Sequence, residues 1–175
     1  MVGRPAGRRV VVVTQGTQNV DPEDLLRPAL GALAGVDALV VAATGIAGRE
    51  QLPFPVPGNV RVGGFLPFET LLPLTDVLIT NGGWGGTLTA LAHGVPLVVA
   101  GGDLDKPEVA ARVESAGAGV NLRTGRPAPS AVRAAYERVT REPAFQEAAH
   151  RIAADLEAAG GAPRAAELLE AFATG

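Results

Sequence analysis

The chain has 175 residues, which is enough for one domain with a full hydrophobic core. Its formal net charge of −3 provides no basic face for a nucleic-acid partner, and the absence of cysteine excludes disulfides and thiolate metal sites. With only two histidines, His93 and His150, a histidine-rich metal site is excluded as well. No apolar run approaches the length of about 18 residues that a membrane span needs.

The basic N-terminus, residues 1–8, precedes a run of four valines at 10–13. This run is shorter than the apolar segment of a secretory signal, which has roughly 7–15 residues. We therefore expect a cytoplasmic protein in which residues 1–8 form an extension and residues 9–175 form one domain.

Short apolar runs, each bounded by turn residues, recur along the chain. They are nearly uninterrupted instead of alternating, which is typical of strands that are buried on both faces of a parallel sheet. The predicted strands cover residues 8–14, 37–44, 59–65, 76–80, 96–101 and 119–122.

Helical patterns follow the strands, and Asp21 and Pro22 are expected to cap and open the first of them. The predicted helices cover residues 22–34, 86–93, 107–116, 130–140, 143–158 and 163–173. Strands that alternate with helices predict an α/β, Rossmann-like, doubly wound parallel sheet of about six strands with flanking helices. Ligands of such sheets bind at the edge formed by the carboxyl ends of the strands.

The polar turn TQGTQN, residues 14–19, follows the first predicted strand and lies at this edge. Hydroxyl groups and free backbone N–H groups in front of a helix suit a phosphate, so Gly16 and Thr17 are candidate ligands. The alternative is a plain strand–helix turn in which Thr17 or Asn19 caps the helix.

Four of the five residues in GGWGG, 82–86, are glycine, and they stand between a predicted strand and a predicted helix. Glycine costs roughly 0.5–1 kcal/mol relative to alanine inside regular structure, so a backbone that must admit an anion is one explanation. No lysine follows as in a P-loop, and Leu88 stands where a dinucleotide fingerprint needs glycine. The alternative is a closely packed turn; Trp84 either covers a phosphate or packs under the loop.

Two further groups are expected at the ligand edge. Asp103, Asp105 and Lys106 follow the fifth predicted strand, where carboxylates can accept hydrogen bonds from sugar hydroxyls. Asp105 could instead simply cap the following helix. Phe65 ends the third predicted strand and either stacks on a nucleobase or fills the core; judged on the residues alone, core packing is favoured for both Phe65 and Phe68.

Two blocks, TNGGWGGTLTALAHGVPLVV at 80–99 and DKPEVAARVESAGAGV at 105–120, carry a family resemblance. They resemble the C-terminal half of the GT-B glycosyltransferases that use nucleotide sugars, which include antibiotic glycosyltransferases of actinomycetes and the UDP-glucuronosyltransferases. The family signature reads His-Gly-Gly-x-Gly-Thr/Ser, Glu-Ala-Leu, Gly-Val-Pro and Asp-Gln-Pro-x-Asn-Ala-x-Arg-Val, and its order and spacing match here. VVTQGT at 12–17 and the Phe65-Leu66-Pro67 segment also fall where the family has donor-site elements.

The resemblance implies a site for a UDP- or dTDP-sugar donor, with no cofactor and no metal. It implies that Phe65 stacks on the base, that the Leu66 backbone bonds the base edge, and that Asn81 stands in place of a diphosphate-binding histidine. Asp105 and Lys106 stand where the family's acidic residue and glutamine contact sugar hydroxyls. The residues that the resemblance places around the diphosphate are Gly16, Thr17, Gly83, Gly85, Gly86 and Thr87.

Four positions depart from the family pattern. Asn81 keeps a neutral donor where the family has histidine, and Thr89 replaces a glutamate that holds the ribose hydroxyls. Gly86 replaces a hydroxyl residue, for which the neighbouring Thr87 is a substitute. Lys106 replaces a glutamine and adds a positive charge that can reach a phosphate instead of a sugar.

A GT-B enzyme has two Rossmann-like domains, and the chain resembles only the second, whereas the acceptor pocket and the usual catalytic histidine belong to the first. Neither His93 nor His150 is expected at the ligand edge, so we predict no catalytic residue here. We expect the chain to bind the donor of an inverting glycosyltransferase and to transfer sugar only together with an acceptor-binding domain or subunit. The alternatives are a non-catalytic donor-binding or assembly module, the donor-binding subunit of a two-chain glycosyltransferase, and a sugar-nucleotide epimerase; a homo-oligomer is left open.

Overall fold

The computed structural model describes residues 7–174, so most of the predicted extension over residues 1–8 lies outside the described residues. In chain order the elements are β1 (Arg9–Thr14), α1 (Leu26–Ala32), β2 (Ala38–Ala43), β3 (Val60–Gly63), α2 (Phe68–Leu71), the 3-10 turn η1 (Leu72–Leu74), β4 (Val77–Thr80), α3 (Trp84–Ala92), β5 (Leu97–Val99), α4 (Lys106–Ser115), β6 (Gly119–Asn121), α5 (Pro129–Arg141), α6 (Pro143–Ala158) and α7 (Gly161–Thr174). All predicted strands and helices are present, with boundaries that differ by a few residues.

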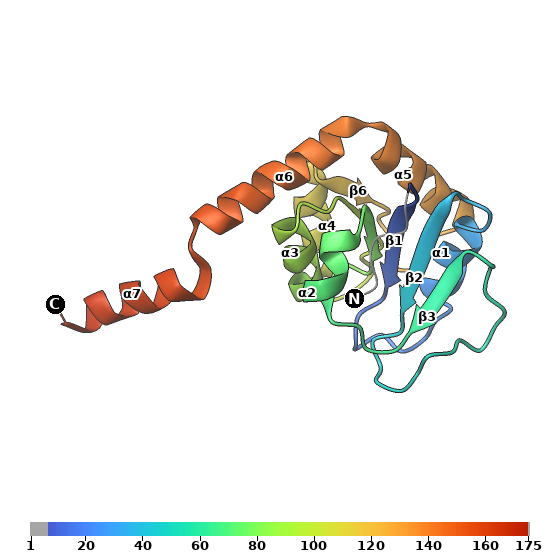
Figure 1. Cartoon of the computed structure of the whole chain (residues 1–175), viewed down its shortest axis with the longest axis horizontal. Coiled ribbons are helices and arrows are strands. Elements are labelled where there is room, and N and C mark those ends of the chain that lie inside the picture. The colour runs from blue at the N-terminus through green and yellow to red at the C-terminus, as the bar shows by residue number, and fades with distance from the viewer. Residues whose placement is uncertain (1–6, 175) are drawn as a thin grey trace.

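The strands form one parallel, six-stranded sheet in the order β3-β2-β1-β4-β5-β6 (Figure 1). The predicted α/β, Rossmann-like fold is confirmed. The first three strands extend the sheet in one direction from β1, and the last three extend it in the other direction from β4. The strand order therefore reverses between β1 and β4, and the crevice at such a point is where doubly wound sheets bind ligands.

Both faces of the sheet are buried, which explains why the apolar runs are uninterrupted. In β1, Val11 and Val13 belong to one core cluster, whereas Val12 belongs to the other. β4 repeats the pattern with Ile79 on the first side and Leu78 on the second. Because successive side chains of a strand point to opposite faces, a strand with a core on each side has no place for a polar alternation.

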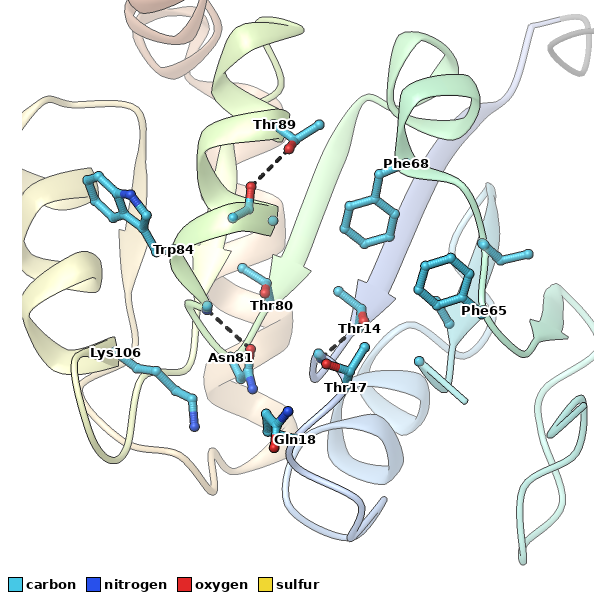
Figure 2. Close-up of a pocket in the computed structure, with 17 residues that line it drawn as sticks. Thr14, Thr17, Gln18, Phe65, Phe68, Thr80, Asn81, Trp84, Thr89 and Lys106 are labelled. Atoms are coloured by element: carbon cyan, nitrogen blue, oxygen red, sulfur yellow. Dashed lines mark hydrogen bonds between the residues drawn. The ribbon is translucent and has the colours of Figure 1, made fainter. Parts of the chain in front are cut away.

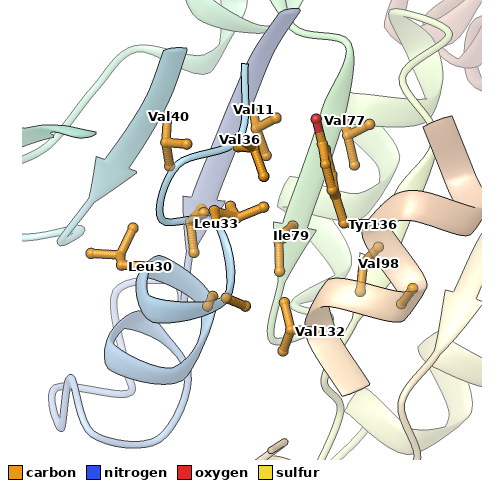
Figure 3. Packing of buried hydrophobic residues seen from close by; sticks show 14 of the residues in the cluster. Val11, Leu30, Leu33, Val36, Val40, Val77, Ile79, Val98, Val132 and Tyr136 are labelled. Carbon is orange, nitrogen blue, oxygen red and sulfur yellow. The ribbon is translucent and has the colours of Figure 1, made fainter. Parts of the chain in front are cut away.

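Helices cover the two faces of the sheet (Figure 1). Leu30 of α1 and Val132 and Tyr136 of α5 pack in the first cluster (Figure 3). The second cluster receives Ala90 and Leu91 from α3, Ala110 and Val113 from α4, and Ala148 and Ala149 from α6. These two layers hold the strand ends, and with them the ligand edge, in a fixed arrangement.

The first helix begins at Leu26, so the prediction of a start at residue 22 with Asp21 as its cap is wrong. Asp21 instead accepts a hydrogen bond from the backbone N of Glu23 at 3.0 Å, inside a turn. The buried side chain of Gln15 takes the capping role, because its Oε1 accepts from the backbone N of Leu26 at 3.3 Å. Its Nε2 donates to the carbonyl oxygens of Asn19 and Asp21 at 3.0 and 2.7 Å.

The C-terminal helix α7 extends away from the sheet (Figure 1). Its large apolar side chains, Leu168, Leu169 and Phe172, are exposed. Within residues 7–174, no helix combines the length and the apolar character needed to cross a membrane.

Candidate functional site

A cavity of about 470 Å³ opens at the carboxyl ends of β1, β2 and β4 (Figure 2). Thr14, Ala43 and Thr80, the last residues of these strands, line it, and Thr14 pairs directly with Thr80 where the strand order reverses. The other lining residues are Gly16, Thr17, Gln18, Gly45, Phe65, Leu66, Phe68, Asn81, Gly83, Trp84, Gly85, Gly86, Thr89 and Lys106. The volume lies in the range of about 300–1,000 Å³ that is typical of small-molecule sites.

The loop after β1 forms one wall of the cavity. Gly16 has a φ of +76°, and its backbone N donates to the Oγ1 of Thr14 at 3.2 Å. Thr17 and Gln18 follow and line the cavity. The structure thus places both Gly16 and Thr17 at this cavity.

The loop after β4 forms the opposite wall and is fixed by Asn81, whose side chain is largely buried. Its Nδ2 donates to the carbonyl oxygen of Gln15, and its Oδ1 accepts from the backbone N of Gly83 at 3.3 Å. Between them, Gly82 has a φ of +84°, and a Cβ there would lie 2.8 Å from Cγ1 of Val99. This position therefore requires glycine, for reasons of backbone conformation and packing.

Helix α3 points its N-terminus at the cavity and begins at Trp84, two residues before its predicted start at 86. Its first intrahelical hydrogen bond runs from the N of Thr87 to the O of Gly83 at 3.0 Å. The N–H groups of Trp84, Gly85 and Gly86 precede this bond, so they belong to the unsatisfied donors of the first helical turn. The helix dipole adds a partial positive charge at the same end.

Gly85 leaves this helix end open. A Cβ on Gly85 would have nothing within 4 Å, although the residue lines the cavity. A Cβ on Gly86 would already meet the ring of Phe68 at 3.4 Å. The space beside Gly85 at the start of α3 is therefore open, whereas that beside Gly86 is limited by the Phe68 ring.

An aromatic side chain lies at the far side of the cavity from Lys106 (Figure 2). Phe65 lines the cavity with 64 % of its surface exposed, so the interpretation that it fills the core is wrong. Phe68 is partly buried against the second core cluster and also lines the cavity. Leu66 lies beside both.

Lys106 supplies a charge to the cavity from the first turn of α4. Its Nζ forms an ion pair with the Oδ1 of Asp103, and its side chain is only 11 % exposed. Asp105 occupies the N-cap position of α4, but its side chain makes no capping hydrogen bond and does not line the cavity. It lies in a separate depression that shares Trp84 with the cavity.

Other predicted residues lie outside the cavity or at its rim. Thr87 is 1 % exposed and does not line the cavity, so its hydroxyl does not stand in for the one missing at Gly86. Trp84 is half-exposed at the rim, so packing under the loop is excluded. His93 ends α3 with its Nε2 3.6 Å from Oε2 of Glu69, away from the cavity.

The second histidine, His150, is exposed on α6, where its Nε2 is 2.8 Å from Nε2 of Gln146. It does not line the cavity. The described residues contain no cluster of three or more histidine, cysteine or acidic side chains that could hold a metal ion.

Several lining residues were not predicted as site residues, namely Thr14, Gln18, Ala43, Gly45, Phe68, Thr80 and Thr89. Three of them carry a signal that could have found them. Thr14, Ala43 and Thr80 end predicted strands, and strand ends at the reversal of strand order are where ligands bind.

The family described as "Erythromycin biosynthesis protein CIII-like, C-terminal domain" matches residues 27–172. The chain belongs to this family. It is 48 % identical over 165 residues to the 4'-demethylrebeccamycin synthase of Lentzea aerocolonigenes, covering 94 % of this chain and 38 % of that enzyme. The chain thus spans well under half the length of this relative.

Solved structures of glycosyltransferases have the same fold. The calicheamicin glycosyltransferase CalG4 superposes with a TM-score of 0.83 at 31 % identity, covering 98 % of this chain and 45 % of that one. The glycosyltransferase VinC, solved in complex with dTDP, superposes with a TM-score of 0.73 at 31 % identity, covering 89 % and 39 %. The predicted resemblance to GT-B glycosyltransferases is confirmed.

Proposed function

We propose that the chain binds a nucleoside diphosphate sugar, with UDP or dTDP as its nucleotide, as the C-terminal half of an inverting glycosyltransferase. The observation that carries the proposal is the polarity of the cavity, which has Phe65 at one end and Lys106 at the other. A nucleotide sugar has the same arrangement, with a flat base at one end and an anionic diphosphate further along.

The aromatic end is suited to the base. Phe65 keeps 64 % of its surface exposed in a protein whose other aromatic side chains are few. A ring that remains exposed beside a cavity offers a flat face for stacking, a contact worth roughly 1–3 kcal/mol per base in nucleic-acid complexes.

The opposite end is suited to the diphosphate. Gly85, Gly86 and Lys106 line the same cavity, and the N–H groups of the two glycines lie in the first turn of α3, where they have no partner within the helix. Helix N-termini bind phosphates because free N–H groups and the helix dipole act together. The relative VinC, which was solved with dTDP, supports a nucleoside diphosphate as the ligand class.

The proposed reaction divides between this chain and an acceptor-binding part. The acceptor oxygen attacks the anomeric carbon and loses its proton to a base, while the bond from that carbon to the β-phosphate oxygen breaks and its electron pair stays on the phosphate. This chain holds the departing diphosphate. Neither histidine lines the cavity, so the base is assigned to the acceptor-binding part.

A thermal-shift panel of UDP, dTDP and GDP, each free and as its glucose conjugate, tests this function. A ligand that binds only the folded state raises apparent stability by RT ln(1 + [L]/Kd), so a UDP or dTDP compound should raise the melting temperature with rising concentration. If none of the six compounds stabilises the chain at millimolar concentration, the proposal is wrong.

A further inference from the structure

The cavity has one charged lining side chain, Lys106, among the described residues. Its other lining side chains are apolar, hydroxyl or amide groups. The chain as a whole carries a net charge of −3, whereas the groups that bring charge to this cavity, the Lys106 ammonium and the N-terminus of α3, are positive. Low-dielectric walls of one charge sign concentrate the field on an oppositely charged ligand.

The backbone of Lys106 is fixed against the loop that precedes α3. A Cβ on Gly82 would lie 3.4 Å from the carbonyl oxygen of Lys106 and 3.6 Å from its Cβ. The backbone N of Lys106 donates to the carbonyl oxygen of Asp103 at 3.1 Å. The start of α4 therefore packs closely against Gly82, whose neighbours Asn81 and Gly83 line the same cavity.

The ion pair between Lys106 and Asp103 is asymmetric. The lysine side chain is 11 % exposed and the aspartate side chain is 71 % exposed. The ammonium thus lies inside, and the carboxylate reaches it from solvent. A carboxylate in water is well solvated when it is released, so its hold on the ammonium is weak.

We propose that Lys106 binds the diphosphate of the nucleotide rather than the hydroxyls of the sugar, and that Asp103 competes with the nucleotide for the ammonium. This inference rests on the proposed nucleotide-sugar function. Asn81 is neutral and donates to Gln15, so Lys106 is the lining residue that can neutralise phosphate charge. A phosphate that it meets can also reach the N–H groups at the start of α3.

Lys106 could bind the diphosphate or contact the sugar hydroxyls, and these two roles predict different contributions to the affinity for each ligand. When the anomeric C–O bond breaks, its electron pair leaves one more negative charge on the β-phosphate. A lysine that binds the diphosphate should therefore contribute more to the binding of the free nucleoside diphosphate than to that of the sugar donor. A lysine that contacts sugar hydroxyls should contribute to the donor alone.

Calorimetric titration of wild type and Lys106→Gln with UDP, UMP and UDP-glucose, and with the dTDP series, separates these roles. We expect Lys106→Gln to lower the affinity for the free nucleoside diphosphate at least about tenfold. A hydrogen bond to a charged group contributes more than the free energy that corresponds to a tenfold change in affinity. The affinity for UDP-glucose should fall less, and the affinity for UMP should fall least. Arg123→Gln, which removes an exposed cation that pairs with Glu114, is the matched control and should change none of the three.

Asp103→Asn gives an independent reading, because it changes an exposed side chain that does not line the cavity. The substitution releases the ammonium and should raise the affinity for the free nucleoside diphosphate.

The inference is overturned if Lys106→Gln binds UDP and dTDP like wild type and loses affinity only for the sugar conjugates. It is also overturned if Asp103→Asn lowers the affinity for the free nucleoside diphosphate. If wild type binds UDP-glucose and dTDP-glucose well but neither free diphosphate, the inference fails while the proposed function stands; if wild type binds no nucleotide, the proposed function fails first.

Discussion

The side-chain amide of Asn81 joins the two loops that face each other across the cavity. Its Nδ2 donates to the carbonyl oxygen of Gln15, which lies 66 residues earlier, and its Oδ1 accepts from the backbone N of Gly83. One buried amide thereby fixes the β1 loop and the start of the glycine-rich loop relative to each other. In the protein without ligand, Asn81 holds together the two loops that form the cavity walls. The charge of the cavity comes from Lys106.

Asn81→Asp should disrupt this junction with almost no change in side-chain size. The new carboxylate oxygen faces the Gln15 carbonyl without a proton to donate, and it brings negative charge to the proposed diphosphate site. We expect the free energy of unfolding to fall by about 1–3 kcal/mol and nucleoside diphosphate affinity to fall with it. Urea denaturation and calorimetry measure the two effects.

Asn59→Asp is the matched control for this change. The Nδ2 of Asn59 also donates to backbone carbonyl oxygens, at 3.0 Å for Leu33 and 3.3 Å for Val36, but it lies outside the cavity. It should lose stability and keep nucleotide affinity. Equal nucleotide affinity in Asn81→Asp and wild type would remove Asn81 from the account of the site.

Gly85→Val should fill the cavity and leave the fold intact. A Cβ on Gly85 meets open space, so the free energy of unfolding should change by less than about 1 kcal/mol. The same side chain occupies the approach to the α3 N-terminus, so diphosphate affinity should fall at least about tenfold if one charge-assisted hydrogen bond is lost. Gly31→Val, on the exposed side of α1 with open space around it, is the control and should bind like wild type.

Phe65→Ala should weaken the binding of the nucleobase without affecting the binding of the phosphates. Since Phe65 is 64 % exposed, its loss should cost little stability. We expect affinity for uridine or thymidine nucleotides to fall by about 1–3 kcal/mol, as for loss of one stacking contact, while inorganic pyrophosphate binds unchanged. Phe172→Ala removes an exposed ring on α7 and should leave both affinities unaltered; a similar loss in both variants would point to a non-specific effect.

Gln15→Leu tests the unusual start of α1. The side chain is 1 % exposed and makes hydrogen bonds with Asn19, Asp21 and Leu26, all of which a leucine abolishes. Because buried backbone groups would then be left without partners, the free energy of unfolding should fall by roughly 2–4 kcal/mol. A change below the error of urea denaturation would show that these backbone groups find other partners.

The sheet and its ligand edge could be predicted because burial on both faces leaves a direct trace in the sequence. Runs such as the valines at 10–13, bounded by turn residues and rich in β-branched side chains, are typical of strands buried on both faces. The glycines at 82–86 likewise predicted close approach to the backbone, and the structure places Gly83, Gly85 and Gly86 at the cavity.

The features that were missed depend on tertiary contacts. The cap of α1 comes from Gln15, at the end of another element, so no pattern around residues 21–26 could reveal it. Thr87 was assigned to the diphosphate by the resemblance, but its side chain is buried. From Trp84 onward, Thr87, Ala90 and Leu91 share one helical face by their i, i+3 and i+4 spacing, and that face is buried.

The central claim is that the cavity at the β1–β4 crevice binds a nucleoside diphosphate, and parallel calorimetric titration of wild type and Gly85→Val with UDP and with dTDP tests it most directly. The account predicts saturable one-to-one binding of at least one of the two to wild type and at least about tenfold weaker binding to the equally stable variant. Equal affinity of the two proteins, or no saturation of wild type at millimolar ligand, would contradict it.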